Sequence, residues 1–376
     1  MSSKLRFVDP NKSRFYSTVK QRVDEYFIAN KISKDANLAM YFKVAFYLAG
    51  TLALYLTIIS GVLMPNLGLM FVCCLLLGFF GAMIGFNVSH DAIHGSLSSN
   101  PKINKLVSYS FCFIGANAYM WNISHNIVHH TFTNIPGHDE DIEVAPGLVR
   151  LSPADEVKGI HKYQHYYAFL LYGFAALSWI FRKDFKKFFQ KEIGNYDNAN
   201  HSKMAYFELF FFKFLYYFLV IPVPLMLLDI TWYQFLIGFV SLQLTKGFVI
   251  GLVFQLAHVV EGTTFPEPNE DGNIEEAWAV HQMHTTANFS RTSWLATFIC
   301  GGLNMQIEHH LFPRVCHIHY PQISEIVKST AHEFGVPYIE NKTFLSALAS
   351  HYRTLRYFGK YALEEKYNNN VTSMVA

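Results

Sequence analysis

Three short stretches of this chain carry histidines at spacings that suit metal binding. They are HDAIH at 90–94, HNIVHH at 125–130 and NMQIEHHLFP at 304–313, and we call them the first, second and third histidine groups. Imidazoles four residues apart share one helical face, with Cβ atoms roughly 5–6 Å apart, and can bind one ion. Adjacent histidines project about 100° apart, so one of them can reach a second ion. The predicted ligands in these groups are His90, His94, His125, His129, His130, His309 and His310.

The ligand types narrow the chemistry of such a site. Imidazole suits zinc, copper, iron and nickel, and this many ligands favour two ions over one. A hydrolytic dizinc site would include bridging carboxylates, and soluble di-iron bundles use glutamates and Glu-x-x-His motifs. Here Asp91 and Glu308 lie inside the groups, where we expect them to accept hydrogen bonds from imidazole N–H groups. Asn126 and Gln306 are further polar candidates for contacts with the imidazoles.

Other histidines have weaker patterns. His258 ends a long apolar segment at the level of the three groups, so the residues alone leave ligand and interfacial roles equally open. His281 and His284 have i, i+3 spacing, and we expect structural roles or contacts with the ligands for them. His317 and His319 alternate, as on a strand or a loop, and we expect both at the surface.

The elements that position these groups are those of a membrane protein. The chain of 376 residues is 51% apolar and only 15% charged, whereas soluble domains carry about a quarter charged residues. Helices cross a bilayer core with about 20 apolar residues. The net charge of +2, without a basic stripe, excludes a nucleic-acid partner. Spanning helices are predicted at about 40–64, 67–88, 207–228 and 232–257.

The distribution of lysine and arginine predicts the orientation of these spans. The turns within the two pairs of spans contain neither residue, whereas 1–39, 89–206 and 258–376 contain nearly all of them. By the positive-inside rule these three regions are cytoplasmic. We therefore expect one all-α integral membrane domain over residues 1–376, with two helical hairpins under a cytosolic helical cap that holds a di-metal site. Lys213 and Lys246 interrupt the spans and are expected to snorkel or face a cavity.

The cap is predicted to contain several short elements. An amphipathic helix is expected at 17–29, and the apolar run 106–120 is too short for a span and predicts one interfacial or re-entrant helix. In 181–191 phenylalanines alternate with lysines, as on a helix lying in the membrane interface. The acidic run 139–141 is expected to be a solvated loop, although it could order the second histidine group. The asparagines at 368–370 predict a frayed end.

The three histidine groups resemble the boxes of the membrane fatty acid desaturases, H-x(3–4)-H, H-x(2–3)-HH and H/Q-x(2–3)-HH. The surrounding HHTFTNIPGHDEDI, AHVVEGTTFP, HQMHTTANFS and GGLNMQIEHHLFP are similar to the bacterial acyl-lipid or acyl-CoA members. The resemblance implies four transmembrane helices under a cytosolic cap with two iron ions, and O₂ as co-substrate. It also implies that His258, at the end of the fourth span, is a metal ligand.

The resemblance implies a cis double bond introduced into a fatty acyl chain on a lipid or on coenzyme A, at the cytoplasmic face of a bacterial membrane. Gln306, which opens the third group, resembles the front-end desaturases, which act between an existing double bond and the carboxyl end. No HPGG haem motif occurs in the sequence, so we expect a separate electron donor, ferredoxin or cytochrome b5 with its reductase. The alternatives are a fatty acid or sphingolipid hydroxylase, or a carotenoid ketolase, of the same superfamily. A metal transporter would need its ligands near the bilayer middle and is disfavoured.

Overall fold

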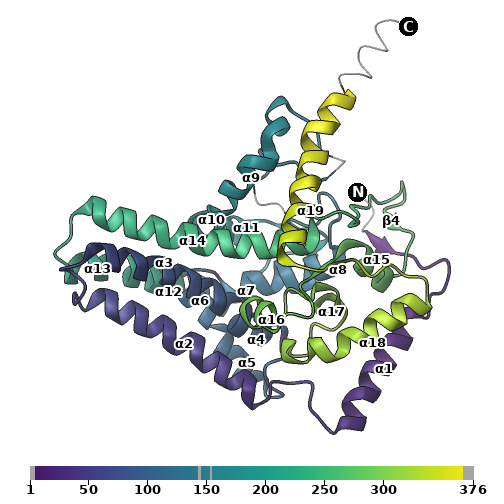
Figure 1. Cartoon of the computed structure of the whole chain (residues 1–376), viewed down its shortest axis with the longest axis horizontal. Coiled ribbons are helices and arrows are strands. Elements are labelled where there is room, and N and C mark those ends of the chain that lie inside the picture. Colours follow the sequence, from purple (N-terminus) through teal and green to yellow (C-terminus); the bar gives the residue numbers. More distant parts are fainter. Residues whose placement is uncertain (1–4, 143–144, 153–154, 367–376) are drawn as a thin grey trace, which may run out of the picture.

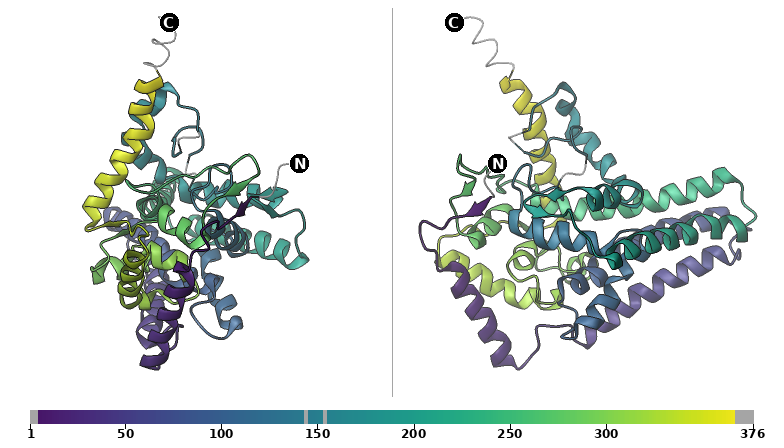
Figure 2. Two further views of the ribbon diagram at one scale, coloured as in Figure 1. Left: turned by 90° about the vertical axis from the view of Figure 1, so that its right-hand side faces the viewer. Right: turned by 180° about the vertical axis from the view of Figure 1, so that it is seen from behind.

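The computed structural model describes residues 5–142, 145–152 and 155–366 and is predominantly helical. The asparagines at 368–370 lie outside the described residues. Within the described ranges, four helices are long and apolar enough to cross a membrane. They run side by side and project from one end of the molecule, and the shorter elements gather at the other end (Figures 1 and 2). The four are Leu38–Ile59, Leu67–His94, Lys203–Leu227 and Trp232–His258.

The bounds of two spans differ from the prediction for local reasons. Helix α2 (Leu38–Ile59) ends before 64, because Gly61 takes a positive φ of 72°. The second span continues beyond 88 as α3 (Leu67–Ile84), the π-helix η1 (Gly85–Ser89) and α4 (His90–His94). Gly95 ends α4 in the left-handed conformation that glycine adopts without strain. The first histidine group therefore forms the last turn of the span itself.

The remaining spans are α12 (Lys203–Val220), which continues into α13 (Pro222–Leu227), and α14 (Trp232–His258). Side-chain oxygens of Ser202 and Thr231 cap α12 and α14 by accepting backbone N–H bonds. Helices α3 and α14 approach closely at Gly78, where a Cβ atom would lie 2.3 Å from the Leu242 carbonyl oxygen. Large apolar side chains point outward, as with Phe214, which is 69% exposed. Such a surface suits contact with lipid.

The short helices before the third span are more broken than the sequence predicts. The single helix expected at 106–120 is wrong, because Gly115 has a φ of 94° and Asn117 caps a new helix. Phe188 and Lys187 of the phenylalanine-rich segment are both buried, so its lysines do not all face outward. The helices are α5 (Pro101–Ser108), α6 (Ser110–Phe113), α7 (Ala118–Trp121), π-helix η2 (Asn122–His129), α8 (His130–Phe132), 3₁₀-helix η3 (Gly159–Tyr163), α9 (Gln164–Tyr172), α10 (Ala175–Ser178), π-helix η4 (Trp179–Lys183) and α11 (Asp184–Phe189).

The elements after the fourth span complete the histidine-bearing end. The amphipathic helix predicted near the N-terminus is α1 (Phe15–Asn30), which buries Phe15, Val19, Val23 and Phe27 against α15 and α18. The later helices are α15 (Trp278–Thr285), α16 (Trp294–Cys300), α17 (Gln306–Leu311), η5 (His317–His319), α18 (Tyr320–Glu333), α19 (Phe344–Arg356) and η6 (Tyr357–Tyr361). Two parallel strand pairs join distant segments: β1 (Arg6–Phe7) with β4 (Asn273–Ile274), and β5 (Asn288–Phe289) with β6 (Glu340–Asn341). A third pair, β2 (Glu192–Ile193) with β3 (Tyr196–Asp197), is a local antiparallel hairpin.

The lysines within the spans are buried inside the protein and do not snorkel to the membrane surface, so that alternative is wrong. Lys213 is buried and lies 2.8 Å from Asp184 of α11, and it also donates to the Gly115 carbonyl at 2.8 Å. Lys246 is buried as well and donates to the Ile114 carbonyl at 2.6 Å. Carbonyls at the ends of short helices lack partners within their own helix. These lysines therefore tie the spans to the short helices.

Candidate metal centre

The structure brings all eight predicted ligands together in three overlapping groups. Within each group the nearest ligand atoms lie within 4.8 Å of one another, and every histidine is buried. The ligands come from α4, η2, α8, α14 and α17, so segments more than 200 residues apart in sequence meet here. The groups are His90, His94, His125 and His309; His129, His258 and His310; and His130, His309 and His310.

The two histidine pairs with i, i+4 spacing behave differently. His90 and His94 lie in the same group, with ring planes inclined by 61°. His125 and His129 fall in different groups, and their rings stack nearly parallel at 20° with centroids 4.9 Å apart. Rings stacked in this way direct their outer nitrogens along nearly parallel planes. The first pair therefore lies in one group and the second pair is divided between two groups, although the spacing alone would allow each pair to bind one ion.

Most of the imidazoles are held through Nδ1. His129 donates to Asp139 Oδ2 at 2.8 Å, and His310 donates to Gln282 Oε1 at 2.7 Å. His125 Nδ1 lies 3.4 Å from Asp141 Oδ2, His309 Nδ1 lies 3.2 Å from the Tyr320 hydroxyl, and His258 Nδ1 lies 3.3 Å from the Thr285 carbonyl. Such partners fix the tautomer and the ring orientation of metal-binding histidines.

Most of the Nε2 ring nitrogens have no such partners. The Nε2 atoms of six of these histidines are buried and have no hydrogen-bond partner among the described residues. A buried polar atom without a partner is costly, and in native proteins it usually has a ligand, a water or an ion beside it. A set of clustered, unpartnered imidazole nitrogens fits two metal ions. The six are His90, His94, His125, His129, His130 and His309.

Electrostatics keep the imidazoles in the form that binds metals. Burial lowers the pKa of His125 to about 4, and burial also lowers the pKa values of His130 and His310 well below the usual histidine range. These rings are therefore neutral at pH 7. Burial alone would raise the pKa of Asp141, but Lys187 and Lys183 lower it well below its usual range. Asp141 is thus a carboxylate that can accept from His125.

Two predictions about the surroundings of the site are wrong. The acidic run 139–141 is not a solvated loop, because Asp139 is buried and the side chain of Asp141 is only 8% exposed, both against the second histidine group; its alternative role of ordering that group agrees with the structure. His317 and His319 are not at the surface, since their exposed fractions are 1% and 7%. Asp91 accepts hydrogen bonds from the ring and the backbone N–H of His317. The Nε2 atom of that ring lies 2.9 Å from Lys43 Nζ.

The remaining polar candidates have varied contacts. Gln306 is buried, and its Nε2 atom lies 3.0 Å from His258 Nε2 and 3.3 Å from His310 Nε2. Asn126 donates to the Ile93 carbonyl at 3.1 Å and so joins η2 to α4. The oxygens of Glu308 do not contact an imidazole, contrary to expectation: they accept from Asn288 Nδ2 at 2.7 Å and from the Tyr338 hydroxyl at 2.8 Å.

For His281 and His284 the sequence predicted either a structural role or a contact with the ligands. His281 is fully buried beside Phe7. His284 lies 2.8 Å from Glu276, half-buried at the edge of the site. Sequence reasoning missed Gln282 and Tyr320, which hold His310 and His309. A glutamine and a tyrosine without a local pattern give no signal in one sequence.

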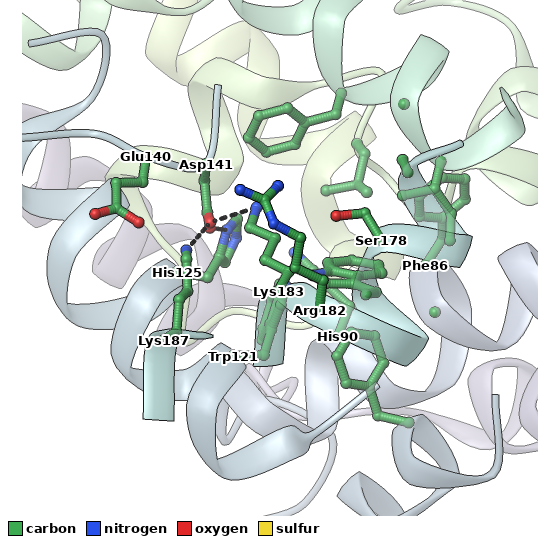
Figure 3. A pocket seen from close by; sticks show the side chains of 18 of the residues that line it. Phe86, His90, Trp121, His125, Glu140, Asp141, Ser178, Arg182, Lys183 and Lys187 are labelled. Atoms are coloured by element: carbon green, nitrogen blue, oxygen red, sulfur yellow. Dashed lines mark hydrogen bonds and ion pairs between the residues drawn. The ribbon is translucent and has the colours of Figure 1, made fainter. Parts of the chain in front are cut away.

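A cavity runs beside the histidines, and its two ends differ in polarity (Figure 3). His90 and His125 line it near Trp121, and Phe86 and Phe254 contribute to its apolar wall. Glu140, Asp141 and Lys187 lie on the side away from Phe86 (Figure 3). The charged residues of the lining are Glu140, Asp141, Arg182, Lys183, Lys186 and Lys187. The arrangement suits an amphipathic ligand whose apolar chain passes the metal site.

Comparisons with known proteins agree with this geometry. The fatty acid desaturase family model matches residues 65–342. The acyl-lipid (8-3)-desaturase of Physcomitrium patens is 38% identical over 356 residues, which cover 94% of this chain and 74% of that protein. The sn-1 linoleoyl-lipid 6-desaturase of Synechocystis sp. is 36% identical over 351 residues, covering 93% and 96%. With its four apolar helices and its buried histidine clusters, the chain belongs to the fatty acid desaturase family, the membrane oxidoreductases that introduce double bonds into fatty acids.

Proposed function

We propose that this chain is an O₂-dependent acyl-lipid desaturase whose eight clustered histidines hold two iron ions. The observation that carries the proposal is the set of buried, unpartnered Nε2 atoms beside a cavity with an apolar wall. Iron bound there would supply the oxidising power that, with O₂, two electrons and two protons, removes two hydrogens from adjacent methylene carbons and yields two waters. The proposed ligands are His90, His94, His125, His129, His130, His258, His309 and His310.

The protein's own part is to orient ligands and substrate. Asp139, Asp141 and Gln282 fix the rings of the second and third histidine groups through Nδ1. The aromatic wall, with Phe86 and Trp121, excludes water and holds an extended chain beside the imidazoles. The position of the acyl chain along this wall decides which of its carbons lie next to the metal site. Desaturation thus requires an ordered ligand shell and a fixed chain depth.

The membrane arrangement is proposed as two hairpins, α2–α3 and α12/α13–α14, under a cytoplasmic cap, in a single domain of a bacterial cytoplasmic membrane. Both hairpin turns lie at the end of the molecule away from the histidine-bearing helices, and neither contains lysine or arginine (Figure 1). A cysteine at Asp229 should react with an impermeant reagent outside intact cells, whereas one at Lys162 should react only after permeabilisation. The reverse pattern would overturn the orientation.

The substrate is proposed to be an acyl chain on a lipid, in which a cis double bond is formed. The relatives that support this proposal include an acyl-lipid (8-3)-desaturase and an sn-1 linoleoyl-lipid 6-desaturase. Gln306 in the third histidine group favours a front-end position. A host that lacks the activity, fed saturated, monounsaturated and polyunsaturated acids in turn, should form a product two hydrogens lighter. A gain of one oxygen would instead indicate a hydroxylase, and unchanged profiles with iron-loaded protein would refute the proposal.

The electrons are proposed to come from a separate protein, ferredoxin or cytochrome b5 with its reductase. Adding each donor system in turn to the purified enzyme identifies the one that supports turnover. The metal assignment has its own test, because the intact protein should contain two iron ions per chain. Replacing both His309 and His310 by alanine should lower the iron content and abolish desaturation. Full activity in that variant would refute the assignment.

A further inference from the structure

Four cations line one end of the cavity: Arg182 and Lys183 on η4, and Lys186 and Lys187 on α11. They fall into two pairs with different surroundings. Lys183 and Lys187 lie 3.3 and 2.8 Å from Asp141 Oδ1, and the other oxygen of this carboxylate faces His125. This inner pair is therefore engaged in supporting a proposed metal ligand.

The outer pair, Arg182 and Lys186, has no such partner. Both side chains are exposed, and neither forms an ion pair or a hydrogen bond within the described ranges. Glu140, the other carboxylate at this end, accepts from Gln190 at 2.8 Å. The two outer cations are four residues apart, so they lie on one face of the helix. Among the described residues that line the cavity, these four cations face two carboxylates, Glu140 and Asp141, which leaves a net charge of +2.

The position of these charges indicates what they bind. In Figure 3 the side chains of Arg182 and Lys183 extend toward Asp141, and Phe86 lies on the opposite side of the pocket. A substrate whose acyl chain lies along the apolar wall would place its head group at the cations. The guanidinium group presents a planar fork to phosphate oxygens, and the ammonium group adds a compact charge.

We propose that Arg182 and Lys186 form a subsite for a phosphate group on the carrier of the acyl chain. This inference rests on the proposed function and extends it by naming the class of head group. A phospholipid and coenzyme A both supply such a phosphate, whereas a galactolipid does not. The inner lysines keep Asp141 and His125 in place, and the outer pair selects the carrier.

The test measures the desaturation of three linoleoyl substrates: phosphatidylglycerol, monogalactosyldiacylglycerol and linoleoyl-coenzyme A. Each substrate is given to the iron-loaded full-length enzyme together with its donor system and neutral lipid vesicles. The variant is R182Q/K186Q. The matched control is K102Q/K162Q, which removes two exposed cations that do not line the cavity. We expect the variant to raise KM about ten-fold for a phosphate carrier, with kcat and the galactolipid KM changed less than about two-fold. The control should leave all three KM values unchanged.

Each substrate gives a decisive outcome. If the KM of the variant rises only for phosphatidylglycerol, a phospholipid is the source of the phosphate. If it rises only for linoleoyl-coenzyme A, coenzyme A is the source. Unchanged KM values, an equal rise with the galactolipid, or an equal rise in the control would overturn the subsite. Iron content and thermal unfolding of the variants show whether the fold is intact.

Binding separates this inference from the proposed function. Native mass spectrometry measures the binding of phosphatidylglycerol and of linoleoyl-coenzyme A, each relative to the galactolipid, without requiring turnover. If no carrier is desaturated by the wild type, the proposed function fails, while a ten-fold loss of either ratio in R182Q/K186Q would still support the subsite. If desaturation proceeds and both ratios are the same in wild type and variant, the subsite alone is refuted.

Discussion

Replacing Asp139 by asparagine should weaken iron binding while keeping the shape of the site. Asp139 is 2% exposed, and its Oδ2 atom accepts from His129 Nδ1 at 2.8 Å and from the Asn134 backbone N–H at 2.9 Å. Asparagine has almost the same volume but removes the charge and half of the acceptor capacity. A hydrogen bond to a charged group contributes about 1.5–3 kcal/mol. At 1.4 kcal/mol per factor of ten, iron affinity should fall roughly 10- to 100-fold, as for other residues that orient metal-binding histidines.

The assay measures iron per chain after equilibration with a graded series of chelator concentrations. The Asp139→Asn protein should lose half of its iron at a chelator concentration roughly 10- to 100-fold lower than the wild type. Asp271→Asn is the control, because Asp271 is exposed and far in sequence from the histidine groups. Thermal unfolding of the iron-free proteins separates a folding defect from a binding defect. Identical chelator midpoints for Asp139→Asn and wild type would refute the reasoning.

Three further predictions concern the frame of the site. Lys213→Met leaves Asp184 buried without its ion-pair partner and should lower the free energy of unfolding by about 3–5 kcal/mol, as measured by thermal unfolding. Adding Asp184→Asn should restore part of this stability, because it removes the unpaired charge. Gly78→Ala places a methyl group 2.3 Å from the Leu242 carbonyl oxygen and should destabilise the fold by about 1–3 kcal/mol, whereas Gly68→Ala, which meets only Asn66 at 3.4 Å, should have little effect. Gln306→Ala should lower iron retention at a fixed chelator concentration, since the Gln306 carboxamide faces the Nε2 atoms of two proposed ligands and its buried Oε1 atom has no partner among the described residues; unchanged retention would contradict this role.

The apolar helices and the clustered histidines could be predicted from the sequence better than the side-chain contacts between them. Hydropathy located all four apolar helices, because about 20 consecutive apolar residues leave a strong local signal. Spacing selected seven of the eight histidines that the structure places together, because helical periodicity is also local, and the resemblance to the desaturases added His258. The partners of these histidines could not be predicted in the same way. Gln282 and His310 are 28 residues apart, and Asp91 and His317 are 226 apart. Only the packing of distant helices brings such side chains together.

The second histidine group shows how such partners change the meaning of a motif. His90–His94 and His125–His129 have identical spacing, yet only the first pair converges on one cluster. In the second pair Asp139 and Asp141 lie next to the Nδ1 atoms of the neighbouring rings and hold them nearly parallel. Their Nε2 atoms therefore serve two different clusters, which is the arrangement that two metal ions require. His125 and His129 lie on the π-helix η2, and carboxylates that follow the motif hold both rings. These two features thus place two histidines with the same spacing as His90 and His94 in two different clusters of one site.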